Sequence, residues 1–200
     1  MGIKGAKFWD DRDRLHSQEN NPTEAYLKAT LKETKLGWLE SCGPSASVNC
    51  LDALGYDIVI ECPGVFIPQS EEVLMDYFND PNNKTKLNAI RAMDESIPEN
   101  RVPQYYPVAV QEVFNAKAAF QWGKNFDSIV TMLVEGRAVQ LCLIKPGHYI
   151  AAVAYDEDTK EIIYHDSWGA RFPDGKGGFA RRMSKAEYDQ NVKDYFIVYV

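Results

Sequence analysis

The stretch Glu40-Ser41-Cys42-Gly43-Pro44-Ser45-Ala46-Ser47 sets a cysteine immediately before an apolar helical pattern. Proline suits the first turn of a helix, because the N–H that it lacks would have no partner there. Apolar residues at positions 46, 48, 51 and 54 continue the pattern, and Gly55 ends it. The sequence therefore predicts a helix over residues 45–54, with Cys42 at its positive end.

This position favours a reactive cysteine. Only the thiolate form attacks a carbonyl carbon well, and a helix N-terminus lowers a thiol pKa through its free N–H groups and dipole. Taken alone, Cys42 could equally be a buried structural thiol, since free cysteines are often buried. A nucleophile also needs a general base and a group that orients the base.

Two polar residues downstream could fill these roles. Three β-rich apolar runs cover residues 139–144, 149–155 and 161–165; His148 stands at the head of the second, and Asp166 follows the third. In an antiparallel hairpin the start of one strand and the end of the next lie at the same edge. His148 could then take the proton of Cys42, while Asp166 fixes the imidazole tautomer.

The other two histidines are poorer candidates for the base. His165 is the neighbour of Asp166, so its side chain points to the opposite face of the strand, and we expect a structural role. His16 lies in a charged, turn-rich segment, where we expect it to be exposed.

Together, these motifs resemble the C39-like branch of the papain-like cysteine peptidases. Members typically carry Cys-Gly-Pro at a helix start, Gly-His before an apolar strand, and Asp-Pro-Trp-Gly or a close relative. This chain has Asp166-Ser167-Trp168-Gly169 in the last motif, and the resemblance runs roughly from Arg14 to Trp168. It implies Cys42 as nucleophile, His148 as base and Asp166 as orienting residue.

The fold class expected from the element order is α+β. Helical patterns come first and strands later, which fits a papain-like fold with an N-terminal helical layer packed on a C-terminal antiparallel sheet. Further helices are expected over 23–35, 70–78, 87–93, 108–120, 129–135 and 184–192, and further strands over 56–61 and 195–200. Residues 175–178 are glycine-rich and read as a flexible loop.

A papain-like site also needs an oxyanion hole, which usually combines a glutamine side chain with the N–H of the nucleophile. Gln18 lies in a segment that resembles the one preceding the cysteine in C39-like proteins, although it could also be a surface turn residue. Glu40 is nearer to Cys42 in the sequence but is ionised and would repel an oxyanion.

Aromatic residues near the motifs are candidates for substrate binding. Tyr149 and Trp168 belong to the motifs themselves. Tyr105 and Tyr106 lie in a proline-rich stretch, residues 97–107, which is expected to be a loop and a wall of the substrate cleft.

The activity implied is hydrolysis of an amide bond through a thioester acyl-enzyme, without a metal or an organic cofactor. The substrate would be a protein or a cell-wall peptide such as that of peptidoglycan. Two alternatives remain open: transglutaminase-like acyl transfer to an amine, and a non-catalytic papain-like module that binds a partner.

The composition argues against several other classes of protein. The 200 residues suit one domain, residues 1–200, and a net charge of -7 argues against nucleic-acid binding. No stretch is apolar enough to span a membrane, and the N-terminus lacks the apolar core of a signal peptide. We therefore expect a protein that is cytoplasmic as synthesised, with any release occurring by another route.

The four cysteines have no Cys-x-x-Cys spacing, so neither a zinc site nor a redox motif is indicated. Cys50 and Cys142 fall in apolar patterns and should be buried. Cys62 precedes Pro63-Gly64, and the sequence leaves open whether it forms a disulfide. The oligomeric state is also left open.

Overall fold

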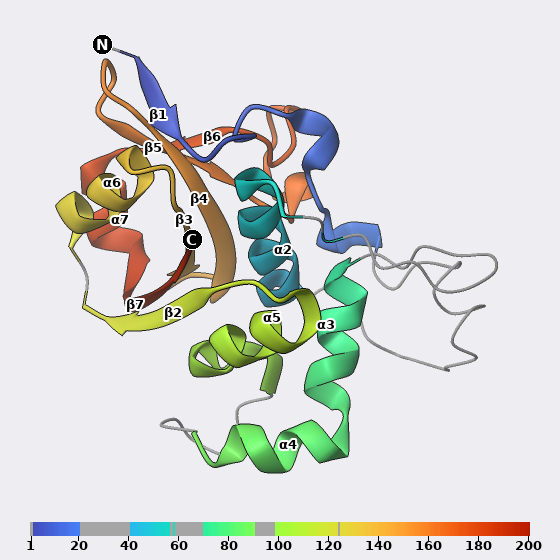
Figure 1. Ribbon diagram of the computed structural model, residues 1–200. Coiled ribbons are helices and arrows are strands. Elements are labelled where there is room, and N and C mark those ends of the chain that lie inside the picture. Colours follow the sequence, from blue (N-terminus) through green and yellow to red (C-terminus); the bar gives the residue numbers. More distant parts are fainter. Residues whose placement is uncertain (1, 21–40, 57, 59–69, 91–98, 124) are drawn as a thin grey trace.

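The computed structural model describes residues 2–20, 41–56, 58, 70–90, 99–123 and 125–200. At its centre is a seven-stranded sheet in the order β2-β7-β3-β4-β5-β6, with β1 paired to β4, and every pairing is antiparallel (Figure 1). The strands are β1 (Ile3–Gly5), β2 (Ala118–Trp122), β3 (Ala138–Leu143), β4 (His148–Asp156), β5 (Glu161–His165), β6 (Arg181–Met183) and β7 (Val192–Tyr199).

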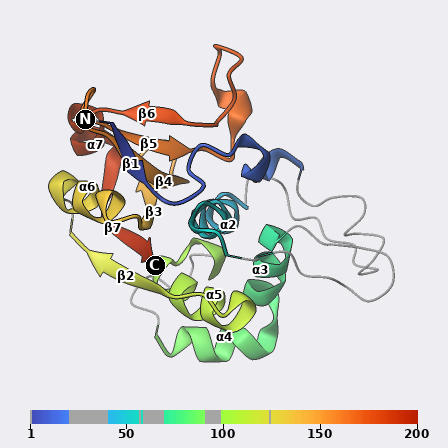
Figure 2. The same ribbon diagram turned by 45° about the horizontal axis from the view of Figure 1, so that its top comes forward.

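Helices cover both faces of this sheet (Figures 1 and 2). The predicted helical layer is present as α2 (Cys42–Leu54), α3 (Ser70–Asn79), α4 (Pro81–Asn88) and α5 (Tyr106–Phe114). The opposite face carries a second layer, α6 (Phe126–Val134) and α7 (Lys185–Asn191). The α+β arrangement expected from the element order is therefore confirmed, and the second helical layer is an addition to it.

Side-chain alternation along the strands builds two separate cores. On β4, Ala151 and Val153 pack into the cluster formed with α2, α3 and α5, whereas Ile150 and Ala152 pack into the cluster formed with α6. All four are fully buried. Both faces of β4 are thus apolar, which explains why its sequence is a continuous apolar run rather than an alternating one.

Helix α2 lies at the middle of the molecule and is buried from Gly43 to Ala53. It begins at Cys42, three residues before the predicted start, and ends as predicted at Gly55, whose φ of 89° is a left-handed conformation that glycine adopts readily. The cluster that includes Val48 and Leu51 shows that the predicted apolar face is the one that packs. The predicted C-terminal end of the helix is therefore confirmed, and its predicted start lies within one turn of the observed one.

A buried polar network fixes α2 on the sheet. Gln140 on β3 donates to the carbonyl oxygen of Gly43 at 3.2 Å and accepts from the Tyr199 hydroxyl at 2.6 Å. The same hydroxyl lies 2.8 Å from the Ser47 hydroxyl on α2. Because these polar atoms are buried, each bond is costly to remove, and the network restricts how the helix can sit.

Several predicted elements differ from those observed. The helix expected over 108–120 ends at Phe114, and residues 118–122 form the edge strand β2 instead. Of the helix expected over 87–93, only residues 87 and 88 are helical, as the last two of α4 (Pro81–Asn88); residues 89–90 form a turn, and residues 91–93 lie outside the described part of the chain. The terminal run belongs to β7, which lies inside the sheet between β2 and β3. The helix expected over 23–35, and nearly all of the strand expected over 56–61, lie outside the described residues.

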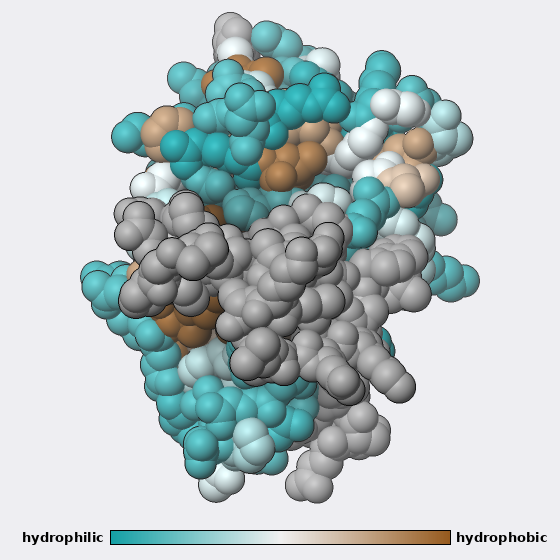
Figure 3. Space-filling view, turned by 90° about the vertical axis from the view of Figure 1, so that its right-hand side faces the viewer, coloured by the Kyte–Doolittle hydropathy of each residue, from teal (hydrophilic) through white to brown (hydrophobic). Residues whose placement is uncertain are grey.

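Hydrophilic residues dominate the coloured surface in Figure 3, where apolar residues form small separate groups. The large apolar side chains that are exposed come from several elements, and Trp122 on β2 is the most exposed at 63%. Among the helices that the structure describes, none combines the length and the apolarity needed to cross a bilayer.

Candidate active site

Cys42 is the first residue of α2 and is partly exposed. Burial of the thiol raises its pKa, but a hydrogen bond with His148, the charge of His148, the N–H of Tyr149 and the charge of Arg101 outweigh that effect. The pKa of Cys42 is therefore lower than that of an ordinary thiol. The other two described cysteines show the opposite behaviour, because burial raises the pKa of both Cys50 and Cys142.

His148 is the first residue of β4 and is 3% exposed. Its Nε2 lies 2.7 Å from Oδ1 of Asp166, and it is also hydrogen-bonded to Cys42. Burial lowers the imidazole pKa, but the contacts with Asp166 and Cys42 raise it to about 9. A lowered thiol pKa beside a raised imidazole pKa favours an ion pair of thiolate and imidazolium near neutral pH.

The structure thus brings together the three side chains that the sequence singled out. Asp166 accepts a second hydrogen bond at Oδ1, from the backbone N–H of Trp168 at 2.9 Å. Its Oδ2 lies 2.6 Å from Nη2 of Arg171, and the carboxylate is fully buried. The Trp168 ring packs edge-on against His148, with 5.9 Å between ring centroids, and so shields the histidine from water.

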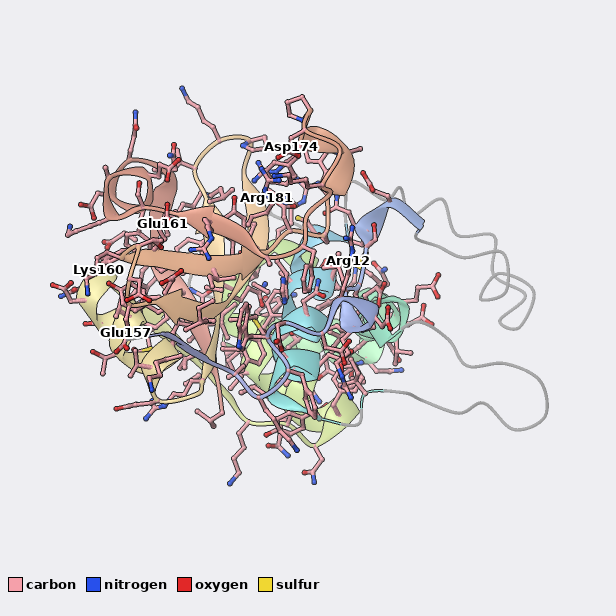
Figure 4. The ribbon with its side chains drawn as sticks, turned by 90° about the horizontal axis from the view of Figure 1, so that it is seen from above. Arg12, Glu157, Lys160, Glu161, Asp174 and Arg181 are labelled. Carbon is pink, nitrogen blue, oxygen red and sulfur yellow. The ribbon has the colours of Figure 1, made fainter. Side chains whose placement is uncertain are left out.

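The backbone of Asp166 is held by the loop before β6. Its N–H donates to the carbonyl oxygen of Gly178 at 2.8 Å, and a Cβ at position 178 would lie 1.7 Å from the Asp166 oxygen. In Figure 4, Asp174 of this loop lies beside Arg181 of β6, and their ion pair measures 2.8 Å. The stretch expected to be a flexible loop is therefore packed against the site at Gly178.

Gln18 lies in the 3-10 helix η2 (Gln18–Asn20) and is fully buried, which excludes the alternative of a surface turn residue. Its Oε1 accepts from the Ser167 hydroxyl at 2.8 Å, and its backbone N–H donates to the Ser167 carbonyl at 3.1 Å. Its Nε2 has no hydrogen-bond partner within the described part of the chain. Because Gln18 and Cys42 line the same cleft, this N–H₂ is available to a ligand there.

The cleft has a volume of about 450 Å³. The residues that line it are Gln18, Cys42, Arg101, Cys142, Pro146, Gly147, His148, Tyr149, Trp168, Lys193 and Tyr195. Two of the four aromatic residues predicted to bind substrate, Tyr149 and Trp168, belong to this lining.

The other two, Tyr105 and Tyr106, do not line the cleft, and the prediction for them is corrected. Both are fully buried in the core under the helical layer, where the Tyr105 hydroxyl donates to Asn88 at 2.9 Å. Tyr106 packs edge-on against Phe78, with 5.1 Å between ring centroids. The proline-rich stretch looked like an exposed loop, but its second half forms η5 (Pro103–Tyr105) and the start of α5.

The two remaining histidines lie outside the cleft. His165 accepts from the N–H of Ala180 at 3.2 Å and stacks on Phe179, and burial lowers its pKa to about 4. It is a neutral structural residue, as strand parity predicts. His16, by contrast, is not exposed as expected: its ring nitrogens lie 3.0 Å from Glu71 and 3.1 Å from Asp52. Burial lowers the pKa of His16, but the two carboxylates raise it to about 9.

Four residues of the site region were not singled out from the sequence: Arg101, Arg171, Lys193 and Tyr195. Extending the strand expected over 195–200 by two residues towards its start would have found Lys193 beside Tyr195, since alternation puts both on one face. Arg101 and Arg171 come from short 3-10 helices and carry no periodic signal. Among the described residues no cluster of His, Cys, Asp and Glu is arranged to hold a metal ion.

Known proteins resemble this chain at low identity. A C39-like protein from Bacillus anthracis is 11% identical with a TM-score of 0.49, over 80% of this chain and 88% of that one. The N-terminal peptidase C39 like domain of the toxin secretion ATP-binding protein from Vibrio parahaemolyticus is 14% identical with a TM-score of 0.35, over 64% and 89%. No curated protein matches significantly.

The comparison with protein families matches a larger part of the chain. The sequence pattern of the Peptidase_C39 like family matches residues 14–194, a range that contains all four predicted catalytic residues. Because the match spans most of the chain, the protein belongs to the Peptidase_C39 like family.

Proposed function

We propose that this protein is a cysteine peptidase in which Cys42 is the nucleophile, His148 the general base and Asp166 the orienting residue. The observation that carries the proposal is the unbroken series of contacts from Cys42 through His148 to Asp166. The opposite pKa shifts of the thiol and the imidazole support it further, since they favour the nucleophilic thiolate.

In the first step the thiolate of Cys42 attacks the carbonyl carbon of a peptide bond, and the carbonyl oxygen becomes an oxyanion. The N–H of Cys42 and the Nε2 group of Gln18 would donate to that oxyanion. The C–N bond then breaks, and the leaving amine takes its proton from the imidazolium of His148. A thioester remains on Cys42.

In the second step His148 takes a proton from water as the water attacks the thioester. The C–S bond breaks, the product leaves as a carboxylic acid, and the ion pair of Cys42 and His148 forms again. The buried carboxylate of Asp166 keeps the imidazole oriented in both steps, because His148 Nε2 is bonded to it and Nδ1 is left to face the thiol.

The substrate we infer is a peptide amide, in a protein or in a cell-wall peptide. The test incubates the protein with denatured protein and with purified peptidoglycan, and follows new amino groups. We expect turnover of one of them, and its complete loss in Cys42→Ala. Release that persists in Cys42→Ala contradicts the proposal, whereas incorporation of an added amine in place of water would favour the acyl-transfer alternative.

Two histidine variants provide a matched comparison. His148→Ala should abolish turnover, whereas His165→Ala should retain it at a temperature where the variant is folded, because His165 contacts Phe179 and Ala180 rather than the cleft. Iodoacetamide should label Cys42 faster than Cys142 near neutral pH, and His148→Ala should remove this difference. Equal labelling of the two cysteines in the unmodified protein would count against an activated Cys42.

A further inference from the structure

The described lining of the cleft beside Cys42 has cationic side chains and no acidic ones. Arg101 and Lys193 contribute to it, and none of the lining residues that the structure describes is Asp or Glu. The whole chain has the opposite balance, with 29 acidic and 22 basic residues. A positively charged cleft in an acidic protein indicates that the ligand bound there is anionic, because the cleft walls concentrate the local field.

The two cations come from different layers of the fold. Arg101 ends the 3-10 helix η4 (Glu99–Arg101), and its carbonyl oxygen accepts from the Tyr149 hydroxyl at 3.1 Å. Lys193 lies near the start of β7, on the same face as Tyr195, whose ring centroid is 5.9 Å from the ammonium. Because both line the same cleft, an anion bound there could interact with both.

Within the described part of the chain, no carboxylate neutralises either cation. Arg14, Arg137, Arg171, Arg181 and Arg182 all pair with carboxylates. In contrast, Arg101 and Lys193 form no ion pair within the residues that the structure describes. Arg101 is exposed and Lys193 half-buried, so both charges are free to meet a ligand.

Both charges act on groups inside the cleft. Burial raises the pKa of the Cys42 thiol, and the charge of Arg101 is among the interactions that outweigh it. Burial likewise raises the pKa of Cys142, and the charge of Lys193 partly opposes that rise. The field of the two cations therefore extends over the cleft floor beside the nucleophile.

We propose that the cleft selects peptides that carry a carboxylate within a few bonds of the scissile amide, and that Arg101 and Lys193 bind this carboxylate. This inference rests on the proposed function and names its substrate class. The guanidinium suits a carboxylate because its N–H groups match the two oxygens, and Lys193 adds a second point charge. The two residues determine which peptide binds and exchange no proton or bond with it, and the charge of Arg101 in addition favours the Cys42 thiolate.

The test uses two synthetic libraries of N-acetylated octapeptide amides, one containing Glu and Asp and the other Gln and Asn at the same positions. Cleavage is followed by mass spectrometry. For peptides with the acidic residue next to the cleaved bond, we expect kcat/KM to exceed that of the amide partner by about tenfold. The ratio should fall between about 0.05 M and about 0.5 M salt, because salt screens half-exposed charges.

The variant Arg101→Gln/Lys193→Gln should bring this ratio close to one while amide peptides are still cleaved. Its matched control is Lys4→Gln/Lys117→Gln, which removes two exposed lysines at positions that do not line the cleft and leaves the ratio unchanged. A wild-type ratio near one at every position, or an unchanged ratio in the double variant, would overturn the inference.

A binding experiment in a variant without the nucleophile tests this inference independently of the proposed function. In Cys42→Ala, calorimetric titration with an acidic octapeptide and its amide partner should still show tighter binding of the acid, whether or not the wild type cleaves either peptide. A second titration series uses soluble stem peptides of peptidoglycan, in their native form and with amidated carboxylates. It distinguishes a cell-wall ligand from a protein ligand. Equal binding of acid and amide in both arms refutes the inference.

Discussion

At the scale of single residues, the Ser167 side chain makes a hydrogen bond that the Asp-Ser-Trp-Gly motif does not predict. Relatives of the motif often have proline here, which has no hydroxyl group, whereas this chain uses the Ser167 hydroxyl to hold Oε1 of Gln18 at 2.8 Å. The hydrogen bond fixes which end of the Gln18 amide is the acceptor. The N–H₂ end is then the one without a partner among the described residues.

Replacing Ser167 by Ala should therefore lower kcat about fivefold and leave KM nearly unchanged, since one neutral hydrogen bond is worth about 1 kcal/mol. Ser167→Thr retains the hydroxyl and should restore most of the rate. The rate is measured with the peptide that the wild type cleaves best.

The same substitution in a Gln18→Ala background is the control. If Ser167 acts through Gln18, removing its hydroxyl should have little further effect once the amide is gone. A full effect of Ser167→Ala in that background would show that the hydroxyl acts elsewhere.

At the scale of elements, two tertiary contacts position the catalytic groups. One is the polar network of Gln140, which fixes the start of α2 through the carbonyl oxygen of Gly43, next to Cys42. The other is the contact of Gly178 with the backbone of Asp166. Neither contact touches a reacting atom, and both can be tested by conservative substitutions.

Gln140→Leu should lower the free energy of unfolding by about 1–3 kcal/mol, because it removes the side-chain donor to the buried Gly43 carbonyl and the acceptor of the buried Tyr199 hydroxyl. It should also slow the alkylation of Cys42 by iodoacetamide, because the helix start is no longer held. The matched control is Gln121→Leu, at an exposed position of β2. Unchanged stability and alkylation in Gln140→Leu would mean that apolar packing alone positions α2.

Gly178→Ala should reduce turnover at least about tenfold and destabilise the fold by about 1–3 kcal/mol, because backbone atoms cannot yield to an added methyl group without shifting. The displaced atom would be the carbonyl oxygen of Asp166, which lies 1.7 Å from the added carbon. Gly2→Ala is the control, since nothing lies within 4 Å of its added carbon. Equal activity of the two variants would show that the loop moves aside freely.

At the scale of the whole molecule, the three histidines give stability a dependence on pH in both directions. Contacts raise the pKa of His16 and His148 to about 9, against an ordinary value of 6.5. Their stabilising effect is complete below pH 6.5 and is lost as the pH rises through 9. Burial lowers the pKa of His165 to about 4, so its effect is present above pH 6.5 and is lost as the pH falls towards 4.

We therefore expect the free energy of unfolding to be largest near about pH 6.5 and to fall by several kcal/mol towards about pH 9. His16→Gln should be less stable at neutral pH, and its decline on the alkaline side should be smaller. Denaturant unfolding at several pH values above about 5, where most carboxyl groups stay ionised, measures both effects. An equally steep alkaline decline in His16→Gln would exclude His16 as a source.

The share of the structure that the sequence predicts differs between residues, elements and the whole molecule. The C-terminal end of α2 followed from Gly55, and its start was predicted from Pro44 to within one turn, because helix starts and stops depend on residues adjacent in the chain. The pairing of His148 with Asp166 followed from strand alternation across one hairpin. The role of Gln18 as an oxyanion-hole donor stays a proposal, but the motif alone predicted its position near Cys42.

The remaining features depended on residues that are distant in the sequence. Whether Tyr105 and Tyr106 face the cleft or the core is decided by which helices cover them, and local composition does not contain that information. The same holds for Arg171 beside Asp166, for Gly178 against the Asp166 backbone, and for Arg101 and Lys193 in the lining of one cleft. Periodicity and turn chemistry act over a few residues, so they fix single elements. Contacts between elements arise only when the sheet and its two helical layers pack together, and those contacts gave this site its charge and its support.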